Sequence, residues 1–209
     1  MHTDLSAHLH TPACNQLIEE LKACHDNNAF GKFIGICNSI DDKVVKCLKA
    51  ERVARVVDRF FTRYYYIKGG APYQVLYHSN RICLICLAPT HPAYGEGIAS
   101  VSYDVGNMDR SQNVVKGKSK KGGMILQADT TLALLTTETG TVYKIPSCIR
   151  GKLVEVNTAL QTDAKQLHQA AEGAGYFAIL LPKIENCSDI ISNLLTQQQY
   201  DEQLKKGET

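Results

Sequence analysis

The chain has 209 residues, which is enough for one large domain or two small ones. Its formal net charge of +2 is too small to argue by itself for a partner such as nucleic acid or a membrane surface. No apolar run approaches the roughly 20 residues needed to cross a bilayer. The first Lys or Arg is Lys22, so we expect neither a secretory signal nor an arginine-rich matrix presequence.

Four cysteines in the first fifty residues form two pairs of identical spacing, Cys14-x9-Cys24 and Cys37-x9-Cys47. Apolar residues around each pair recur at helical spacing, so both cysteines of a pair lie on one helical stripe. If the two helices fold antiparallel, the equal spacings align two disulfides. The expected bonds are then Cys14–Cys47 and Cys24–Cys37.

The turns around these helices can also be predicted. Thr11 followed by Pro12 is a helix start signal, because the hydroxyl caps free N–H groups and proline suits the first helical position. Residues 26–28, Asp-Asn-Asn, make a plausible turn between the helices.

Two other interpretations of the cysteines stay open. The spacing alone allows three disulfide connectivities, and four reduced thiols in an ordinary helix pair would show the same spacing. Structural zinc sites usually bring two ligands together within two to four residues, which disfavours zinc. A hairpin of this size buries little apolar surface and needs cross-links or a partner, which favours disulfides.

After residue 52 the chain changes character. A helical pattern continues for two or three turns until Gly69-Gly70-Ala71-Pro72 breaks it. Short β-branched or aromatic runs separated by Gly, Pro and Asn then indicate a small barrel or sandwich. The expected strands are 74–77, 81–87, 98–105, 124–126, 132–136, 142–145 and 176–181.

The predicted fold class is α+β with four parts. Residues 1–52 form the helical hairpin, 53–68 a connecting helix or linker, 69–183 the β-rich domain, and 184–209 a C-terminal helix and tail. Ser188 opens this last helix. Its inward residues are Ile190, Ile191, Leu194 and Leu195.

The first module carries motifs of a known family. These motifs are Met1-His2-x-Asp4-Leu5-Ser6-x-His8-Leu9-His10-Thr11, the twin Cx9C, Lys32-Phe33, Cys37-Asn38 and Lys46-Cys47-Leu48-Lys49. Residues 1 to about 52 resemble the COX assembly mitochondrial proteins, the second member in particular. These are twin-Cx9C proteins of the coiled-coil-helix-coiled-coil-helix (CHCH) type.

This resemblance implies the mitochondrial intermembrane space, a role with other factors in cytochrome c oxidase assembly, and import by oxidative trapping. In such trapping the import oxidase first grips an aromatic face beside a cysteine. Phe30 and Phe33, which precede Cys37 by one or two turns, are candidates for that face. Equally, they are candidates for the hairpin core.

The second module resembles the Abitram or Simiate family of actin-binding transcription modulators, from about residue 55 to 204. The resemblance implies a non-enzymatic, actin-binding protein of nucleus and cytoplasm with the barrel-sandwich hybrid fold of lipoyl carriers and the glycine-cleavage H protein. The motifs are Val57-Asp58-Arg59-x-Phe61-Thr62-Arg63, His78-Ser79-Asn80-Arg81-Ile82-Cys83, His91-Pro92, Ser147-Cys148-x-Arg150-Gly151-x-Leu153-x-Glu155-Val156-Asn157, Leu181-Pro182-Lys183 and Leu194-Leu195-Thr196-Gln197-x-Gln199-Tyr200.

The comparison with lipoyl carriers can be tested on residues. Residues 150–160 look like the second-half strand of such carriers, which present one lysine at the tip of the preceding hairpin. Here that tip, 136–140, reads Thr-Thr-Glu-Thr-Gly, and Lys144 lies on the following strand. We therefore expect no lipoyl-lysine and no cofactor, so the analogy transfers shape without chemistry.

The remaining cysteines and the histidines are weaker candidates. Cys83-x2-Cys86 suggests a metal, but residues three apart on a strand face opposite sides, so buried or half-exposed thiols are favoured. Cys148 and Cys187 are expected to be reduced and structural. His2, His8, His10 and His25 form either a solvated tail or, as oxidase assembly would allow, a copper site.

A basic turn is the other candidate for partner binding, and its residues are Lys116, Lys118, Lys120 and Lys121. It has no interleaved aromatic residues of the kind that stack nucleic-acid bases, so nucleic-acid binding is not favoured. A solvated hairpin tip and docking on an acidic actin surface remain the two interpretations.

The sequence holds no GxSxG, phosphate-binding glycine loop or HExxH motif, so we predict no enzyme. One hypothesis is a true two-module protein of the intermembrane space, with the β-rich domain as a docking surface. The other is an Abitram-type actin-binding protein of nucleus and cytoplasm whose first fifty residues come from a neighbouring reading frame or stay reduced and idle. A lipoyl-carrier component of an enzyme complex is the third class, and the missing lysine disfavours it.

Overall fold

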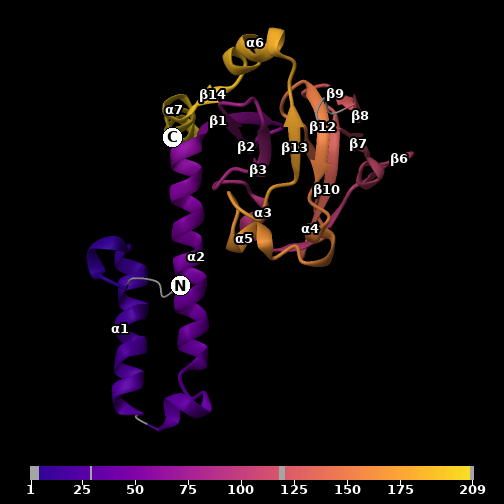
Figure 1. The fold of residues 1–209 in the computed structure, drawn as a ribbon. Coiled ribbons are helices and arrows are strands. Elements are labelled where there is room, and N and C mark those ends of the chain that lie inside the picture. The colour runs from indigo at the N-terminus through magenta and orange to yellow at the C-terminus, as the bar shows by residue number, and fades with distance from the viewer. Residues whose placement is uncertain (1–4, 29, 118–120, 208–209) are drawn as a thin grey trace. The chain divides into compact units, whose positions relative to one another are not determined.

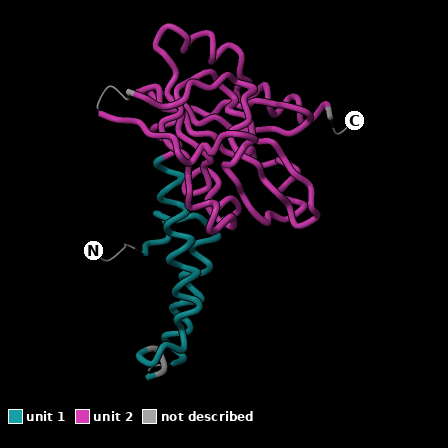
Figure 2. Tube along the Cα trace, turned by 90° about the vertical axis from the view of Figure 1, so that its right-hand side faces the viewer, with its two compact units in different colours: residues 1–56 teal, residues 57–209 magenta. Residues whose placement is uncertain are grey.

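The computed structural model describes residues 5–28, 30–117 and 121–207. The chain divides into two compact units, 1–56 and 57–209, which Figure 2 colours separately. We call them the hairpin unit and the sheet unit. In the part of the chain that the structure describes, none of the helices has the length and apolar character needed to cross a membrane.

Helices α1 (Pro12–Asn27) and α2 (Asn38–Phe60) build the hairpin unit, together with the short 3-10 helices η1 (Ala7–Leu9) and η2 (Gly31–Ile34). The predicted start of α1 is confirmed, because the Thr11 hydroxyl accepts a hydrogen bond from the Cys14 N–H and Pro12 opens the helix. A buried cluster lies between the helices. Its members are Ile18, Leu21, Cys37 and Val44.

The second helix begins later than its apolar stripe suggests. Phe30, Phe33 and Ile34 precede α2, and Gly35 separates them from it with a φ of 88°. This left-handed φ favours glycine, and a Cβ on Gly35 would also lie 2.8 Å from the Asn38 side-chain nitrogen.

In the segment 53–68, predicted as a connecting helix or linker, only the residues up to Phe60 are helical. Helix α2 runs unbroken to Phe60, and the next eight residues form strand β1 (Phe61–Lys68). This strand pairs along its whole length with β2 (Ala71–His78), from Phe61↔His78 to Lys68↔Ala71. Gly69 and Gly70, with φ of 60° and 80°, form the turn between them. The aromatic residues that follow the helix favour a β-strand. The helical pattern of the preceding residues hides this tendency in the sequence.

The described residues of the sheet unit form a seven-stranded sheet of order β14-β1-β2-β3-β13-β12-β9 and a three-stranded sheet of order β11-β10-β4. Figure 1 shows these strands above and around the short helices α3 (Ala93–Glu96), α4 (Ala159–Thr162) and α5 (Gln166–Gln169). The remaining strands of the large sheet are β3 (Cys83–Leu87), β9 (Ile125–Leu126), β12 (Gly151–Val156), β13 (Ala178–Leu181) and β14 (Leu195–Thr196).

The three-stranded sheet consists of β4 (Ile98–Ser102), β10 (Thr131–Thr137) and β11 (Val142–Pro146). The unit also contains two short 3-10 helices, η3 (Arg110–Gln112) and η4 (Ile184–Asn186), and two small two-stranded ribbons. The ribbons are β5 (Asp104–Val105) with β6 (Met108–Asp109), and β7 (Val115–Lys116) with β8 (Lys121–Gly122).

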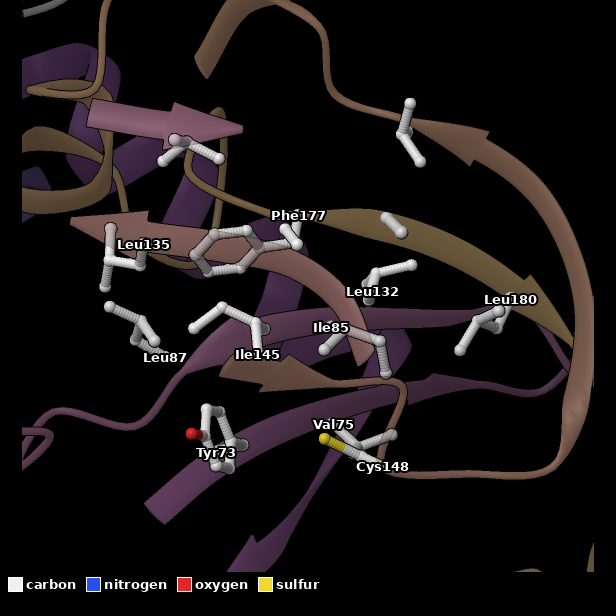
Figure 3. Close-up of a cluster of buried hydrophobic side chains, with 14 of the residues drawn as sticks. Tyr73, Val75, Ile85, Leu87, Leu132, Leu135, Ile145, Cys148, Phe177 and Leu180 are labelled. Carbon is white, nitrogen blue, oxygen red and sulfur yellow. The ribbon is translucent and has the colours of Figure 1, made fainter. Parts of the chain in front are cut away.

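One hydrophobic core joins the two sheets of this unit. The large sheet contributes Val75 and Ile85, and the small sheet contributes Leu132, Leu135 and Ile145, all of them 0% exposed. Figure 3 shows their side chains pointing toward one another around Phe177. Each expected strand overlaps an observed one, and the predicted α+β class is confirmed.

The C-terminal segment is not the single helix that we predict from Ser188. It forms α6 (Cys187–Ser192), strand β14 and α7 (Gln197–Gly207). Leu195 pairs with Tyr65 of β1, so sheet pairing replaces the helix at this point. Stacking of Tyr65 on Tyr200, with ring centroids 3.9 Å apart, then fastens α7 to the same strand.

Candidate functional site

Both predicted disulfides join α1 to the segment that contains α2. Cys14 bonds Cys47 and Cys24 bonds Cys37, with Cα–Cα distances of 5.7 and 6.1 Å that are normal for such bonds. The bonds lie at the two ends of the small apolar cluster. The hairpin unit is therefore closed covalently at both ends.

A buried carboxylate adds a polar tie to the same unit. Glu51 of α2 accepts hydrogen bonds of 2.6 Å from both the backbone N–H and the hydroxyl of Thr11, and its other oxygen lies 2.8 Å from Nδ1 of His10. Burial alone would raise the pKa of Glu51, but the hydrogen bonds from Thr11 and His10 lower it to about 2. The role of Glu51 has no local sequence signal, because its partners lie 40 and 41 positions away.

The apolar residues that precede α2 lie on the surface. Phe30, Phe33 and Ile34 are 89%, 81% and 82% exposed, and Ile36 is 56% exposed. We call these four residues the tip patch. The hairpin-core interpretation of Phe30 and Phe33 is therefore wrong, since both rings lie outside the cluster that contains Cys37. Exposed apolar groups that are contiguous often mark a binding surface.

The described histidines of the hairpin unit do not form a common site. His10 is paired with Glu51 and its side chain is only 5% exposed, so the prediction of a solvated tail is wrong for this residue. His8 is exposed on η1, and His25 lies in the last turn of α1. His2 lies outside the described residues. Among the residues that are described, no three His, Cys, Asp or Glu side chains are grouped as a metal site would require.

The four other cysteines have free thiols. Cys83, Cys86 and Cys148 are buried, and burial raises the pKa of each, for Cys83 to about 12. Cys187 is half-buried and donates a hydrogen bond to the Lys183 carbonyl. The buried thiols are protonated at neutral pH and therefore unreactive.

The basic turn is described only in part. Lys116 of β7 is exposed and pairs with Lys121 of β8, while Lys118 and Lys120 lie outside the described residues. Docking at this turn stays a prediction.

The β10–β11 turn, where a lipoyl carrier would present its lysine, is organised around a carboxylate. Glu96 Oε2 accepts hydrogen bonds of 3.0 Å from the hydroxyls of Thr137 and Thr139, and Oε1 accepts one from Tyr143. These hydrogen bonds lower the pKa of Glu96, that from Tyr143 most. Lys144 is exposed on β11.

One motif behind the second resemblance has a structural role. Arg63 of β1 makes a two-pronged ion pair with Glu172, with N–O distances of 2.5 and 2.6 Å, and also contacts Asp58 at 2.7 Å. The hydrogen bond with Glu172 raises the pKa of Arg63 most, and the one with Asp58 raises it further. Burial acts in the opposite direction but does not offset them. Glu172 was not predicted, since it lies 109 positions away.

Family models match both halves of the chain. Residues 1–63 match the model described as cytochrome c oxidase biogenesis protein Cmc1 like. Residues 94–207 match the model of the glycine cleavage H-protein.

Several curated relatives are named Protein Abitram. The one from Drosophila melanogaster is 75% identical over 150 residues, which cover 72% of this chain and 70% of the relative. The human one is 40% identical over 161 residues, covering 74% and 89%. The one from Dictyostelium discoideum is 30% identical over 138 residues, covering 63% and 77%.

Among solved structures, a glycine cleavage system H protein from Mycobacterium marinum superposes with a TM-score of 0.48 at 17% identity. The superposition covers 69% of this chain and 97% of that one.

Proposed function

We propose a non-enzymatic role in which each unit binds its own partner. The chain belongs to the Abitram family. It contains a glycine cleavage H-protein-like region at 94–207 and a Cmc1-like domain at 1–63. The hairpin unit serves cytochrome c oxidase assembly in the mitochondrial intermembrane space. The sheet unit is a docking surface that binds actin, as the Abitram resemblance implies.

The observation that carries this proposal is the pair of disulfides in the hairpin unit. Disulfides form and persist in oxidising compartments and are rare in the cytosol and nucleus. The cysteines of the sheet unit fit the same environment, because Cys83, Cys86 and Cys148 are buried and protonated. Burial and protonation thus protect these thiols from thiol–disulfide exchange.

The tip patch supports a route into that compartment. Phe30 and Phe33 are exposed and lie just before Cys37 in the sequence. Cys37 forms a disulfide with Cys24. An import oxidase that grips aromatic side chains would therefore find them beside a cysteine that it must oxidise. This assigns the two phenylalanines a binding role rather than a packing role.

Thiol counting on protein from intact cells tests the proposal. The chain has eight cysteines, of which four are free in the structure. Denaturation in an alkylating agent should add four adducts before reduction and eight after it. Eight adducts before reduction would contradict the proposal.

A matched variant controls the count. Cys24→Ser with Cys37→Ser should keep the same four adducts before reduction, because the free thiols are unchanged. In cells, Phe30→Ser with Phe33→Ser should slow oxidation of the wild-type cysteines, so that a fraction of molecules shows eight adducts without reduction.

A second candidate function rests on the sheet unit alone. The Abitram relatives match 63–79% of this chain, and residues 57–209 form their own compact unit with an extensive core. In this alternative the chain is an actin-binding protein of nucleus and cytoplasm, and the first fifty residues are idle or belong to a neighbouring reading frame. Separate transcripts across the codons for residues 48–60 would favour it.

Actin co-sedimentation tests the sheet unit in either case. The full chain should pellet with filamentous actin at micromolar concentration, and absence from the pellet would contradict the actin role. We also propose that no lipoyl group is attached, since the β10–β11 turn has no lysine. A lipoamide adduct in the intact mass would contradict that.

A further inference from the structure

Segments that are far apart in the sequence meet at one pocket of the sheet unit. The pocket has a volume of about 390 Å³ and is lined mainly by the turn after β2, strand β9, the start of β12 and the end of β13. The strand register brings them together, because Lys152 of β12 pairs with Leu181 of β13 on one side and with Ile125 of β9 on the other. Figure 1 shows the end of β13 and strand β9 on the same side of the unit.

The charged lining of this pocket is entirely cationic. Arg81, Arg150, Lys152 and Lys183 line it, and none of the described lining residues is Asp or Glu. We call it the basic pocket. Four cations around one concave surface create a positive potential that attracts carboxylates.

Unusual backbone conformations position the two arginines. Among the described residues, Arg81 and Cys148 are the non-glycine residues with φ in the left-handed region, at 74° and 61°. The first is an arginine of the pocket, and the second turns the chain two residues before Arg150. Such conformations cost about 1–3 kcal/mol each and cluster at functional sites.

The Arg81 side chain is also held in place. Its Nη1 donates a 3.2 Å hydrogen bond to the Pro182 carbonyl. A guanidinium carries five N–H donors in a planar fork, so this bond fixes the group while leaving a face that suits a carboxylate.

The pocket floor depends on a glycine. A Cβ on Gly151 would lie 3.3 Å from the carbonyl carbon of Leu181 and 3.3 Å from the nitrogen of Pro182. Glycine therefore allows the start of β12 and the end of β13 to approach, which brings their flanking cations to one mouth.

The ion pair at the rim of the pocket, between Lys183 and Glu185, is a weak competitor. Glu185 lies 3.5 Å from the Lys183 ammonium, and the two side chains are 72% and 70% exposed. Exposed pairs of this kind contribute at most about 1 kcal/mol. A bound carboxylate can therefore replace Glu185 at little cost.

The rest of the lining decides the class of ligand. Ile125 is 63% exposed on the short edge strand β9, and Leu181 and Pro182 line the same pocket. None of the described lining residues is aromatic, and single-stranded nucleic acids usually require aromatic rings for base stacking. Aliphatic groups among cations instead match a peptide that combines carboxylates with an apolar side chain.

We propose that the basic pocket binds an acidic peptide segment of a partner protein, with its carboxylates on Arg81 and Arg150 and an apolar side chain on Ile125. This inference rests on the docking role proposed above for the sheet unit, and it specifies where that unit would bind and what chemistry it would recognise.

Fluorescence anisotropy on the full oxidised chain tests the inference. The probe is a fluorescein-labelled decapeptide that alternates aspartate and leucine. Arg150→Glu should raise its Kd at least about tenfold, because it reverses a charge that contacts the ligand. Lys144→Glu is the matched control, since it makes the same charge reversal at an exposed position of β11 outside the pocket, and it should change Kd less than about twofold.

Two further arms test the apolar part and the fold. Ile125→Ser should raise the Kd for the aspartate-leucine peptide severalfold but leave the Kd for an all-aspartate peptide unchanged. Arg150 is exposed, so its variant should keep the wild-type circular dichroism. If it does not, Lys183→Glu, also at an exposed residue, should still raise the Kd.

Three results would overturn the inference. They are no saturable binding of the peptide, equal weakening by Arg150→Glu and Lys144→Glu, or saturable binding of oligouridylate in place of the peptide. Actin sedimentation separates this inference from the function proposed above. If the peptide binds but actin does not, only the actin role is contradicted. If Arg150→Glu leaves actin binding intact, actin binds elsewhere and the pocket is not its site.

Discussion

The hairpin unit and the sheet unit are stabilised by different means. The main cluster of the described hairpin consists of Ile18, Leu21, Cys37 and Val44, whereas the core of the sheet unit extends through both sheets. The hairpin therefore depends on two covalent bonds, while the sheet unit depends on packing and keeps its buried cysteines as thiols. A unit with so small a core needs covalent cross-links, and disulfides persist in oxidising environments.

This difference predicts that reduction of both disulfides unfolds the hairpin and leaves the sheet unit intact. Loss of a native disulfide from a small domain costs about 2–5 kcal/mol, which is more than so small a cluster can offset. Far-UV circular dichroism should lose helical signal. All ten tyrosines lie beyond residue 57, so tyrosine fluorescence reports on the sheet unit and should not change.

Helical signal that survives complete reduction would break the comparison, because packing would then suffice for the hairpin. Alkylated protein is the control, since it excludes reoxidation during the measurement.

The opposite effect is expected from a core substitution in the sheet unit. Leu135 is 0% exposed, and Leu135→Ala should destabilise this unit by about 3 kcal/mol through lost burial and a residual cavity. Denaturant unfolding followed by tyrosine fluorescence measures the loss. The hairpin signal should unfold at its wild-type concentration.

Val142→Ala is the matched control, because Val142 lies on the neighbouring strand β11 and is 53% exposed. It should cost less than about 0.5 kcal/mol. Equal losses for both variants would mean that the core does not dominate the stability of this unit.

The sequence predicts the hairpin well because its signals are local. The equal Cx9C spacings fix the pairing once the helices are antiparallel, and Thr11 with Pro12 marks the start of α1. The strand runs are also local, since β-branched residues between turn residues need no distant information. Strand β1 was missed because its aromatic run follows a helix directly, and only pairing with β2 reveals it.

The missed functional residues have distant partners. Glu51 contacts residues 40 and 41 positions away, and Glu172 contacts Arg63 across 109 positions. The basic pocket is assembled from turns and strand ends, and its cations lie in segments that look ordinary in the sequence. Only the strand register brings Arg81 and Arg150 to one mouth.

Glu51 provides a smaller test of the hairpin. Its pKa is lowered from the ordinary 4.5 to about 2, so the folded state favours the carboxylate. Its stabilising effect is therefore fully present above pH 4.5 and is lost as the pH falls toward 2. Glu51→Gln should cost about 1 kcal/mol at neutral pH, comparable to loss of a helix cap, and progressively less as the pH falls toward 2.

Helix unfolding in denaturant, measured by far-UV circular dichroism at several pH values, gives the difference between wild type and variant. Subtraction removes the contributions of other carboxylates. A difference that stays constant down to pH 2 would show that the hydrogen bonds to Glu51 do not depend on its charge.

The smallest effect on stability is expected at the tip patch, and there the comparison becomes sharpest. Phe30 and Phe33 are 89% and 81% exposed, so Phe30→Ser with Phe33→Ser should change hairpin stability by less than about 0.5 kcal/mol per site. Leu21→Ser, at a helical residue that is 7% exposed, is the contrasting variant and should destabilise the hairpin strongly. If the tip variant slows oxidation in cells without changing denaturant unfolding of the oxidised protein, the patch acts in binding. A loss of stability similar to that of Leu21→Ser would instead assign the phenylalanines to packing and remove the basis for import-oxidase docking.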